Sequence, residues 1–280
     1  MGSVQNEAKV AIITGGTSGI GFALAQHLHA KGWRVAIVGR RADLGAQKAS
    51  YLDPLAETAA FEQCDVASYS AQAAMFKNVW ARWGRLDLLI ANAGSVDSGS
   101  WDNFRRRGAA VDDLPPEPDT TCTDAHLKGL IFPEYGAVEA GVIHWVRVNA
   151  PLLKRKEKIT INTVMMGPAI TPVMPGFAKA FLPEQLVLPA TIIKAYDLFI
   201  DDDDNKRTGE TVETAHDQLF WYEMPEHKAG KLNVRNMLVY EPWFAVMYGE
   251  KSGLEDALQE APEGNAQDTG RVEEFGVGMM

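Results

Sequence analysis

The stretch TGGTSGIG, Thr14–Gly21, lies between an apolar run, Val10–Ile13, and a segment with the composition of a helix, Phe22–Leu28. A strand followed by a glycine turn and a helix leaves the first backbone N–H groups of the helix free to bind a phosphate. The glycines allow a tight turn, a close approach of backbone to pyrophosphate, and close packing of helix on sheet. The stretch therefore predicts a nucleotide site near the N-terminus.

Length and composition suit one large domain. Together with the strand, glycine turn and helix around Thr14–Gly21, they predict an α/β fold, a doubly wound parallel sheet of the Rossmann type. The 280 residues are 46% hydrophobic, which is enough to build a large core. We expect a single domain over residues 1–280, with its core at about 10–215 and a C-terminal extension at 216–280. No internal repeat interrupts it.

Net charge and cysteine content indicate which partners and which cellular compartment to expect. A net charge of -10 argues against nucleic acid or an acidic membrane as the main partner. Cys64 and Cys122 form no disulfide framework, which favours a reducing compartment. The polar N-terminus and the lack of any run near ~18 apolar residues predict a protein of the cytoplasm without a membrane span.

Strands and helices alternate along the chain as a parallel sheet requires. Beyond the first strand, turn and helix, the expected strands are Arg34–Val38, Ala59–Cys64, Leu86–Ala91, Ile159–Val164 and Glu210–Ala215, and the expected helices are Ser70–Trp83, Ala137–Leu153 and Gln185–Ile200.

Two polar segments are expected to be loops. Asp97–Thr123 is rich in Gly, Pro, Asp and Arg, and Asp201–Asp204 is typical of a solvated turn between a helix and a strand. Four consecutive carboxylates repel one another and do not converge on one ion without a fold around them. No metal site is predicted.

Three motifs in order, TGxxxGIG at Thr14–Gly21, Asp65-Val66 and Asn92-Ala93-Gly94, resemble those of the short-chain dehydrogenase/reductase family. The resemblance implies that Asp65 and Val66 contact the adenine and that Asn92, Ala93 and Gly94 steady the sheet edge under the cofactor. It also implies that the glycine turn binds the cofactor through Gly15, Thr17, Ser18, Gly19, Ile20 and Gly21.

Two later stretches extend the resemblance. Ile159–Thr171 is similar to the family's "INxVxPG…T" stretch, which assigns Ala169 and Thr171 to the nicotinamide end of the cofactor. His126-Leu127-Lys128-Gly129 resembles the family's NLKG, which assigns Lys128 to the cofactor. Met165–Pro189 would then be a mobile cover for the substrate, with Met174, Phe177 and Phe181 as apolar lining or as core.

The end of the second strand indicates which cofactor is bound. It reads Gly39-Arg40-Arg41, without the acidic residue that holds the ribose 2′-hydroxyl of NAD. Arg40 and Arg41 can instead form charge-assisted contacts with a 2′-phosphate, which favours NADP(H). The alternative is that the two arginines merely solvate the strand end.

The catalytic residues depart from the family's Asn-Ser-Tyr-Lys set. Tyr135 resembles the family's tyrosine, a proton donor, but Glu139 stands in the position of the lysine. A carboxylate one helical turn away disfavours phenolate and raises the pKa of the phenol. His126 stands in the position of the family's asparagine, and His144 lies about on the opposite helix face from Tyr135.

The family's catalytic serine has no counterpart here. Only Pro133 and Glu134 separate Phe132 from Tyr135, where the family has the rest of a helix and the strand that carries the serine, about four dozen residues. The chain is therefore expected to lack one central-to-edge strand. Either its neighbours pair directly or the gap stays open. The loss would also weaken the homodimer or homotetramer that the family commonly forms.

Three hypotheses about function follow. The first is an NADP(H)-dependent oxidoreductase that interconverts a ketone and a secondary alcohol on a small lipophilic metabolite, as in secondary metabolism. The second is a catalytically impaired nucleotide-binding protein or a non-redox derivative, such as an isomerase or cyclase. The third is a truncated gene product of an oxidoreductase gene.

Overall fold

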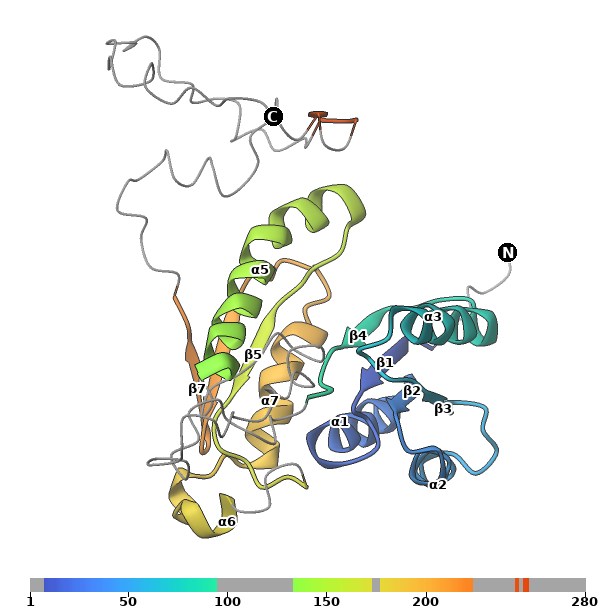
Figure 1. The fold of residues 1–280 in the computed structure, drawn as a ribbon, viewed down its shortest axis with the longest axis horizontal. Helices are drawn as coiled ribbons and strands as arrows, with labels where there is room; N and C mark the ends of the chain where they lie inside the picture. Colours follow the sequence, from blue (N-terminus) through green and yellow to red (C-terminus); the bar gives the residue numbers. More distant parts are fainter. Residues whose placement is uncertain (1–7, 95–132, 173–176, 224–244, 247–248, 252–280) are drawn as a thin grey trace, which may run out of the picture.

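The computed structural model describes residues 8–94, 133–172, 177–223, 245–246 and 249–251. Its N-terminal half is a four-stranded parallel sheet in the order β3-β2-β1-β4, with helices on both faces (Figure 1). The strands are β1 (Val10–Thr14), β2 (Arg34–Gly39), β3 (Ala59–Gln63) and β4 (Leu88–Ile90), and the helices are α1 (Gly19–Ala30), α2 (Ala42–Leu52) and α3 (Tyr69–Trp83).

Both faces of this sheet are buried, which is why Val10–Ile13 of β1 and Val35–Val38 of β2 are continuous apolar runs. Alternate residues of β1 face opposite ways, so that Ile13 packs in one core with Leu24 and Leu28 of α1. Ile12 packs in the other core with Met75 of α3. The register, with Val10 of β1 opposite Arg34 of β2, brings the carboxyl ends of the strands to one edge.

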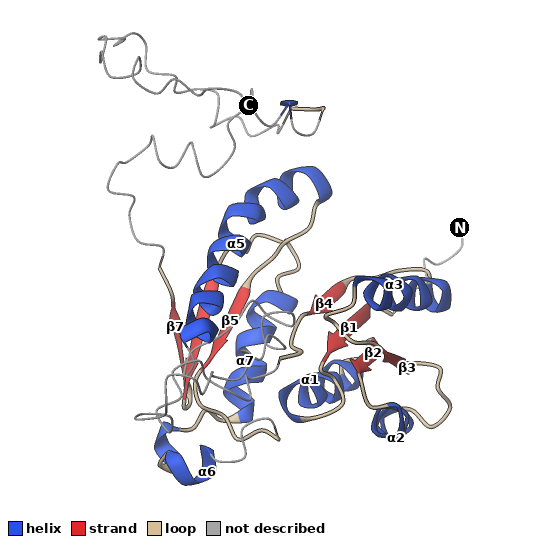
Figure 2. Cartoon of the chain, viewed as in Figure 1, coloured by secondary structure: helices blue, strands red, loops and turns tan. Residues whose placement is uncertain are grey.

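The C-terminal half is a second sheet in the order β5-β6-β7, drawn in red beside the long helix α5 (Figure 2). β5 and β6 are parallel, and β6 and β7 form an antiparallel hairpin. Its strands are β5 (Thr163–Met166), β6 (Thr211–Ala215) and β7 (Gln218–Trp221), and its helices are α5 (Pro133–Glu157), α6 (Phe177–Ala180), a 3-10 turn (Pro183–Gln185) and α7 (Pro189–Ile200).

The two sheets do not join within the described ranges, because β4 pairs with β1 and β5 pairs with β6. The prediction of an α/β fold with a parallel sheet is confirmed. Among the described residues no strand fills the gap between β4 and β5, and these two strands do not pair directly with each other. The absence of a strand from the whole chain stays a prediction. Leu89 on β4 is 47% exposed and Met166 on β5 is 41% exposed. These apolar side chains lie on the two strands that border the gap.

Helices α1 and α7 connect the two halves. His27 Nε2 on α1 lies 2.9 Å from Asp197 Oδ1 on α7, and Lys31 Nζ lies 2.6 Å from Asp201 Oδ1. Tyr196 packs against the core beneath α1, and burial raises the pKa of its phenol to about 12. The contact between α1 and α7 is therefore apolar at its buried centre and ionic at its edge.

Several element boundaries differ from the sequence-based expectation. The strand expected at Leu86–Ala91 covers only Leu88–Ile90. Ahead of it the Val10 N–H donates to the Asp87 carboxylate at 2.8 Å, and beyond it the Asn92 N–H donates to Thr14 Oγ1 at 3.0 Å, so side chains take part in the pairing at both ends. The helix expected at Ala137–Leu153 extends over Pro133–Glu157. The segment Asp97–Thr123 lies outside the described residues. No helix in the described ranges is both long and apolar enough to cross a membrane.

Candidate cofactor site

The glycine turn joins β1 to α1 at the carboxyl edge of the first sheet. Gly15 and Gly19 have φ of 64° and 53°, in the left-handed region that favours glycine. A Cβ on Gly21 would lie 2.5 Å from both Asn92 Nδ2 and the Gly15 carbonyl oxygen. The turn therefore requires glycine at these three positions, at Gly15 and Gly19 for the backbone conformation and at Gly21 for the close approach of the neighbouring groups.

The N-terminus of α1 is suited to bind an anion. Ser18 is the N-cap residue, and its side chain forms no capping hydrogen bond. The first helical turn carries no acidic side chain. Free N–H groups at a helix N-terminus, together with the helix dipole, attract phosphate. The cradle at Gly15–Gly21 therefore fits the pyrophosphate of a dinucleotide.

Thr14 and Asn92 join the ends of β1 and β4 beneath this turn. Thr14 Oγ1 accepts hydrogen bonds from the N–H groups of Asn92 at 3.0 Å and Ala93 at 2.9 Å. Asn92 Nδ2 donates to the Thr14 carbonyl at 3.0 Å. Asn92, Ala93 and the exposed Gly94 thus stand beside the glycine turn, where the family resemblance places them.

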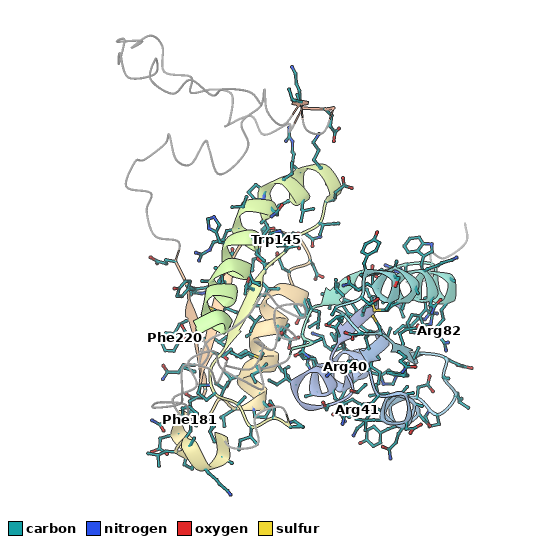
Figure 3. All side chains as sticks on the ribbon, viewed as in Figure 1. Arg40, Arg41, Arg82, Trp145, Phe181 and Phe220 are labelled. Atoms are coloured by element: carbon teal, nitrogen blue, oxygen red, sulfur yellow. The ribbon has the colours of Figure 1, made fainter. Side chains whose placement is uncertain are left out.

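The ends of β2 and β3 form the other side of the crevice. Arg40 and Arg41 follow β2 and are exposed (Figure 3). The Arg40 carbonyl accepts from Gln63 Nε2 at 3.0 Å, which holds its backbone while its side chain stays at the surface. Asp65 is exposed, and its Oδ1 accepts from the Ala67 N–H at 3.0 Å. Val66 follows, with its carbonyl 2.6 Å from Gln72 Nε2.

The chain after β5 returns to the glycine turn. A Cβ on Gly19 would lie 3.4 Å from Pro172 Cδ and 3.7 Å from Thr171 Cβ. Ala169 precedes them and is half-buried. The two halves of the molecule therefore meet at the start of α1, although their sheets do not join.

The catalytic candidates are only partly described. Tyr135 and Glu139 lie in the first turns of α5, where the backbone alone is described, and His126 and Lys128 lie outside the described residues. His144 is exposed. The structure therefore places the helix that bears the tyrosine but not the tyrosine's contacts.

The expected substrate cover is also only partly described. Met174 lies outside the described residues, and the side chain of Phe177 at the start of α6 is not described. Phe181 is half-buried beside this short helix. Which residues line the substrate pocket stays a prediction.

The acidic run Asp201–Asp204 disperses its charges. Asp201 Oδ1 lies 2.6 Å from Lys31 Nζ and Asp204 Oδ2 lies 2.5 Å from Lys206 Nζ, while Asp202 Oδ2 accepts from the Arg207 N–H at 2.7 Å. Each of these carboxylates thus faces its own donor. No group of three metal-ligating side chains gathers in the part of the chain that the structure describes.

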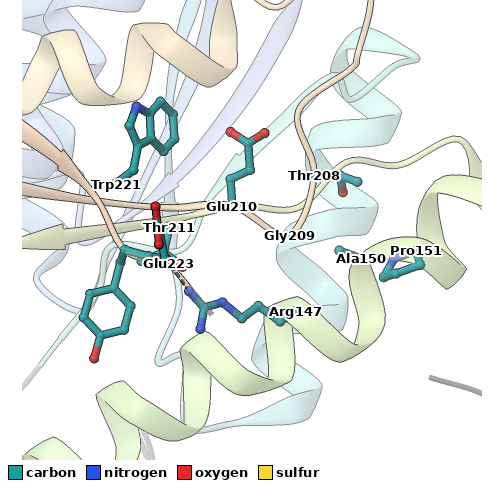
Figure 4. A pocket seen from close by; sticks show the side chains of 10 residues that line it. Arg147, Ala150, Pro151, Thr208, Gly209, Glu210, Thr211, Trp221 and Glu223 are labelled. Atoms are coloured by element: carbon teal, nitrogen blue, oxygen red, sulfur yellow. Dashed lines mark hydrogen bonds between the residues drawn. The ribbon is translucent and has the colours of Figure 1, made fainter. Parts of the chain in front are cut away.

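A separate cavity of about 360 Å³ lies between α5 and the β6-β7 hairpin (Figure 4). Thr211, the first residue of β6, lines it, so the cavity lies at the amino end of that strand, whereas the candidate cofactor site lies at the carboxyl ends of the strands of the first sheet. Arg147 Nη2 donates to the Tyr222 carbonyl at its rim. Sequence reasoning missed this cavity because it did not anticipate β7, which provides one wall.

Comparison with known proteins agrees with the family resemblance of the sequence motifs. The model of the short chain dehydrogenase family matches residues 9–108. The short-chain dehydrogenase/reductase prx6 of Penicillium rubens is 36% identical over 92% of this chain and 100% of its own length. Human 15-hydroxyprostaglandin dehydrogenase [NAD(+)] is 40% identical over 34% of this chain and 36% of its own.

A solved structure agrees on the fold. The crystal structure of a short chain dehydrogenase from Bacillus anthracis superposes with a TM-score of 0.61 at 20% identity, covering 78% of this chain and 99% of that one. Figure 1 shows the open sheet with helices on both faces that this likeness reflects.

The alignment with the Penicillium protein also indicates a length difference. It spans 301 positions, whereas 92% of 280 residues is about 258 residues, so about 43 aligned positions have no residue from this chain. This number is close to the four dozen residues that the sequence predicts to be missing ahead of Tyr135. The relative is therefore longer in its matched part.

Proposed function

Since this chain belongs to the short-chain dehydrogenase/reductase family, we propose that it is a dehydrogenase/reductase that takes NADP(H) and interconverts a small lipophilic ketone and its secondary alcohol. The observation that carries the proposal is the glycine turn after β1. Gly15 and Gly19 have positive φ, and a Cβ on Gly21 would lie 2.5 Å from Asn92 Nδ2. A dinucleotide bound there would supply or accept the hydride.

The preference for NADP(H) rests on charge. Arg40 and Arg41 follow the end of β2 with exposed side chains, and β2 itself ends at Gly39 rather than at an acidic residue. A guanidinium forms a paired, charge-assisted contact with a phosphate, which the 2′-phosphate of NADP(H) offers and NAD(H) lacks. Gly19, Thr171 and Ala169 would enclose the pyrophosphate and the nicotinamide end.

We expect proton transfer from Tyr135 to the substrate to be slow. Tyr135 would donate a proton to the carbonyl oxygen, and Glu139 lies one helical turn further along α5. A carboxylate there opposes the phenolate that proton donation leaves behind, whereas the family's lysine would favour it. With no serine to orient the carbonyl, we propose slow turnover by this chain.

The second candidate, a protein that binds nucleotide without hydride transfer, is favoured by the open gap between β4 and β5. No strand of the described residues fills that gap, and the strand expected to be absent is the one that carries the family's serine. We also propose that a homodimer or homotetramer, if formed, is weakened by the same loss.

Replacing Glu139 by lysine tests the catalytic proposal. Glu139→Lys should raise NADPH-dependent reduction of small lipophilic ketones by roughly threefold to tenfold, because a cation one helical turn away lowers the pKa of the phenol and makes it a better proton donor. Loss of NADPH absorbance is the measurement. Glu157→Lys, at the exposed end of the same helix, makes the same charge change and should leave the rate unaltered. If none of the three proteins turns over any ketone, the oxidoreductase proposal is wrong and the binding protein remains.

A further inference from the structure

Thr17 of the glycine turn packs directly over Gly39, the last residue of β2. A Cβ on Gly39 would lie 2.9 Å from Thr17 Cγ2 and 3.1 Å from Thr17 Oγ1. Thr17 is only 6% exposed. Gly39 lies about 20 residues beyond the glycine turn, at the position from which dinucleotide-binding folds present an acidic side chain to the ribose 2′-hydroxyl. Thr17 therefore fills the space that the first atoms of such a side chain would need.

Rotation of the Thr17 side chain does not relieve this contact. The threonine Cβ carries two heavy γ atoms and one hydrogen in three staggered positions. Both positions near Gly39 are filled, at 2.9 and 3.1 Å. Any other staggered rotamer places the hydrogen in one of the two positions and still leaves a heavy atom in the other. A side chain at residue 39 is therefore crowded in every rotamer of Thr17.

The backbone on both sides of the contact is also held. The Gly39 carbonyl accepts from the Cys64 N–H at 3.0 Å, and the Gly16 N–H donates to the Val38 carbonyl at 3.1 Å. β2 lies between β1 and β3, so that its end cannot move away from the turn without breaking a ladder. The distance from Thr17 to Gly39 is thus fixed by the sheet.

We propose that Thr17 is a specificity-determining residue for the cofactor. By crowding residue 39 it keeps the end of β2 free of an acidic side chain, and it leaves the ribose side of the crevice to the exposed Arg40. This inference rests on the proposed function, because it assumes that a nicotinamide dinucleotide binds along the glycine turn.

Four variants test the role of Thr17. Gly39→Asp alone should weaken NADPH binding without improving NADH binding, because the crowded carboxylate repels phosphate and does not reach the ribose. Thr17→Ala with Gly39→Asp should bind NADH about tenfold more tightly than Gly39→Asp does, the worth of one charged hydrogen bond. Thr17→Val with Gly39→Asp keeps both γ atoms and should behave as Gly39→Asp. Thr17→Ala alone reports any effect of the hydroxyl itself. Cofactor fluorescence in a titration measures each affinity.

Thermal unfolding without cofactor provides the second readout. Gly39→Asp should lower the midpoint by about 3 °C or more, and adding Thr17→Ala should restore most of that loss while Thr17→Val should not. The inference about Thr17 is overturned if Gly39→Asp alone already binds NADH as well as the double variant that adds Thr17→Ala, or melts at the same temperature as that variant. If the unsubstituted protein binds neither NADPH nor NADH, the proposed function fails instead.

Discussion

Asp87 shows how one side chain sets the start of the fold. Its Oδ2 accepts from the Val10 N–H at 2.8 Å and from Arg85 Nε at 2.8 Å, so that it joins the beginning of β1 to the approach to β4. Partial burial alone would raise the pKa of the Asp87 carboxyl. The hydrogen bonds from Arg85 and Val10 outweigh burial and hold the pKa below its ordinary value.

This predicts an acid-dependent contribution to stability. Since the pKa of Asp87 is lower in the folded state, its contribution is complete above the unfolded value of about 3.9 and is lost as the pH falls through the folded value. Asp87→Asn should lower the free energy of unfolding by about 1–2 kcal/mol at pH 7. The difference from the unsubstituted protein should shrink below about pH 4.

Urea unfolding between pH 3 and pH 7 measures this difference. Asp203→Asn is the control, because the Asp203 side chain is 89% exposed and 3.9 Å from Lys9 Nζ. That variant should stay within about 0.5 kcal/mol of the unsubstituted protein at every pH. A pH-independent cost for Asp87→Asn would show that packing rather than charge is lost.

At the scale of elements, sequence periodicity identified the strands of the first sheet more readily than the helix between two of them. β1 and β2 were predictable because continuous apolar runs mark strands buried on both faces. α2 was not assigned because Gly45 interrupts a segment with little apolar character. Gly45 faces Phe61 of β3 so closely that a Cβ would lie 2.1 Å from its ring. The helix is thus fixed by a tertiary contact that its own sequence does not show.

β7 shows the same limit of prediction from sequence. Gln218–Trp221 leaves aromatic side chains exposed on both sides of the strand, so that it has no alternating pattern, and only pairing with β6 identifies it. By contrast, the gap ahead of Tyr135 could be predicted because a family motif is absent. The side-chain positions of Tyr135 and Glu139 could not, because a motif gives order along the chain and not contacts.

The Gly45 contact predicts a substitution that breaks the usual preference of helices for alanine. Gly45→Ala should destabilise the protein by about 1–2 kcal/mol, because crowding of Phe61 exceeds the gain of about 1 kcal/mol in helix propensity. Gly141→Ala in α5, where nothing lies within 4 Å of the added Cβ, should instead stabilise by up to about 1 kcal/mol. Chemical denaturation compares the two. Equal or greater stability of Gly45→Ala would contradict the packing of α2 described above.

At the scale of the whole molecule, the described residues proposed to bind the cofactor lie close together, whereas the two sheets do not join within the described ranges. The turn, the strand ends and the Thr171 segment meet around Gly19, while β4 and β5 remain unpaired with each other. Helices α1 and α7 hold the halves together through His27 and Asp197. Cofactor binding and proton transfer are therefore expected to differ in this protein. The described residues proposed to bind the cofactor lie together, whereas the family's catalytic set of residues is interrupted in the sequence.

Equilibrium titration of the full chain with NADPH and with NADH tests this account most directly. We expect NADPH to bind at least about tenfold more tightly than NADH, because Arg40 and Arg41 would contact its charged 2′-phosphate. Gly21→Ala should abolish both affinities by placing a Cβ 2.5 Å from Asn92 Nδ2, whereas Gly141→Ala should change neither. Equal or tighter binding of NADH, or binding that survives Gly21→Ala, would contradict it.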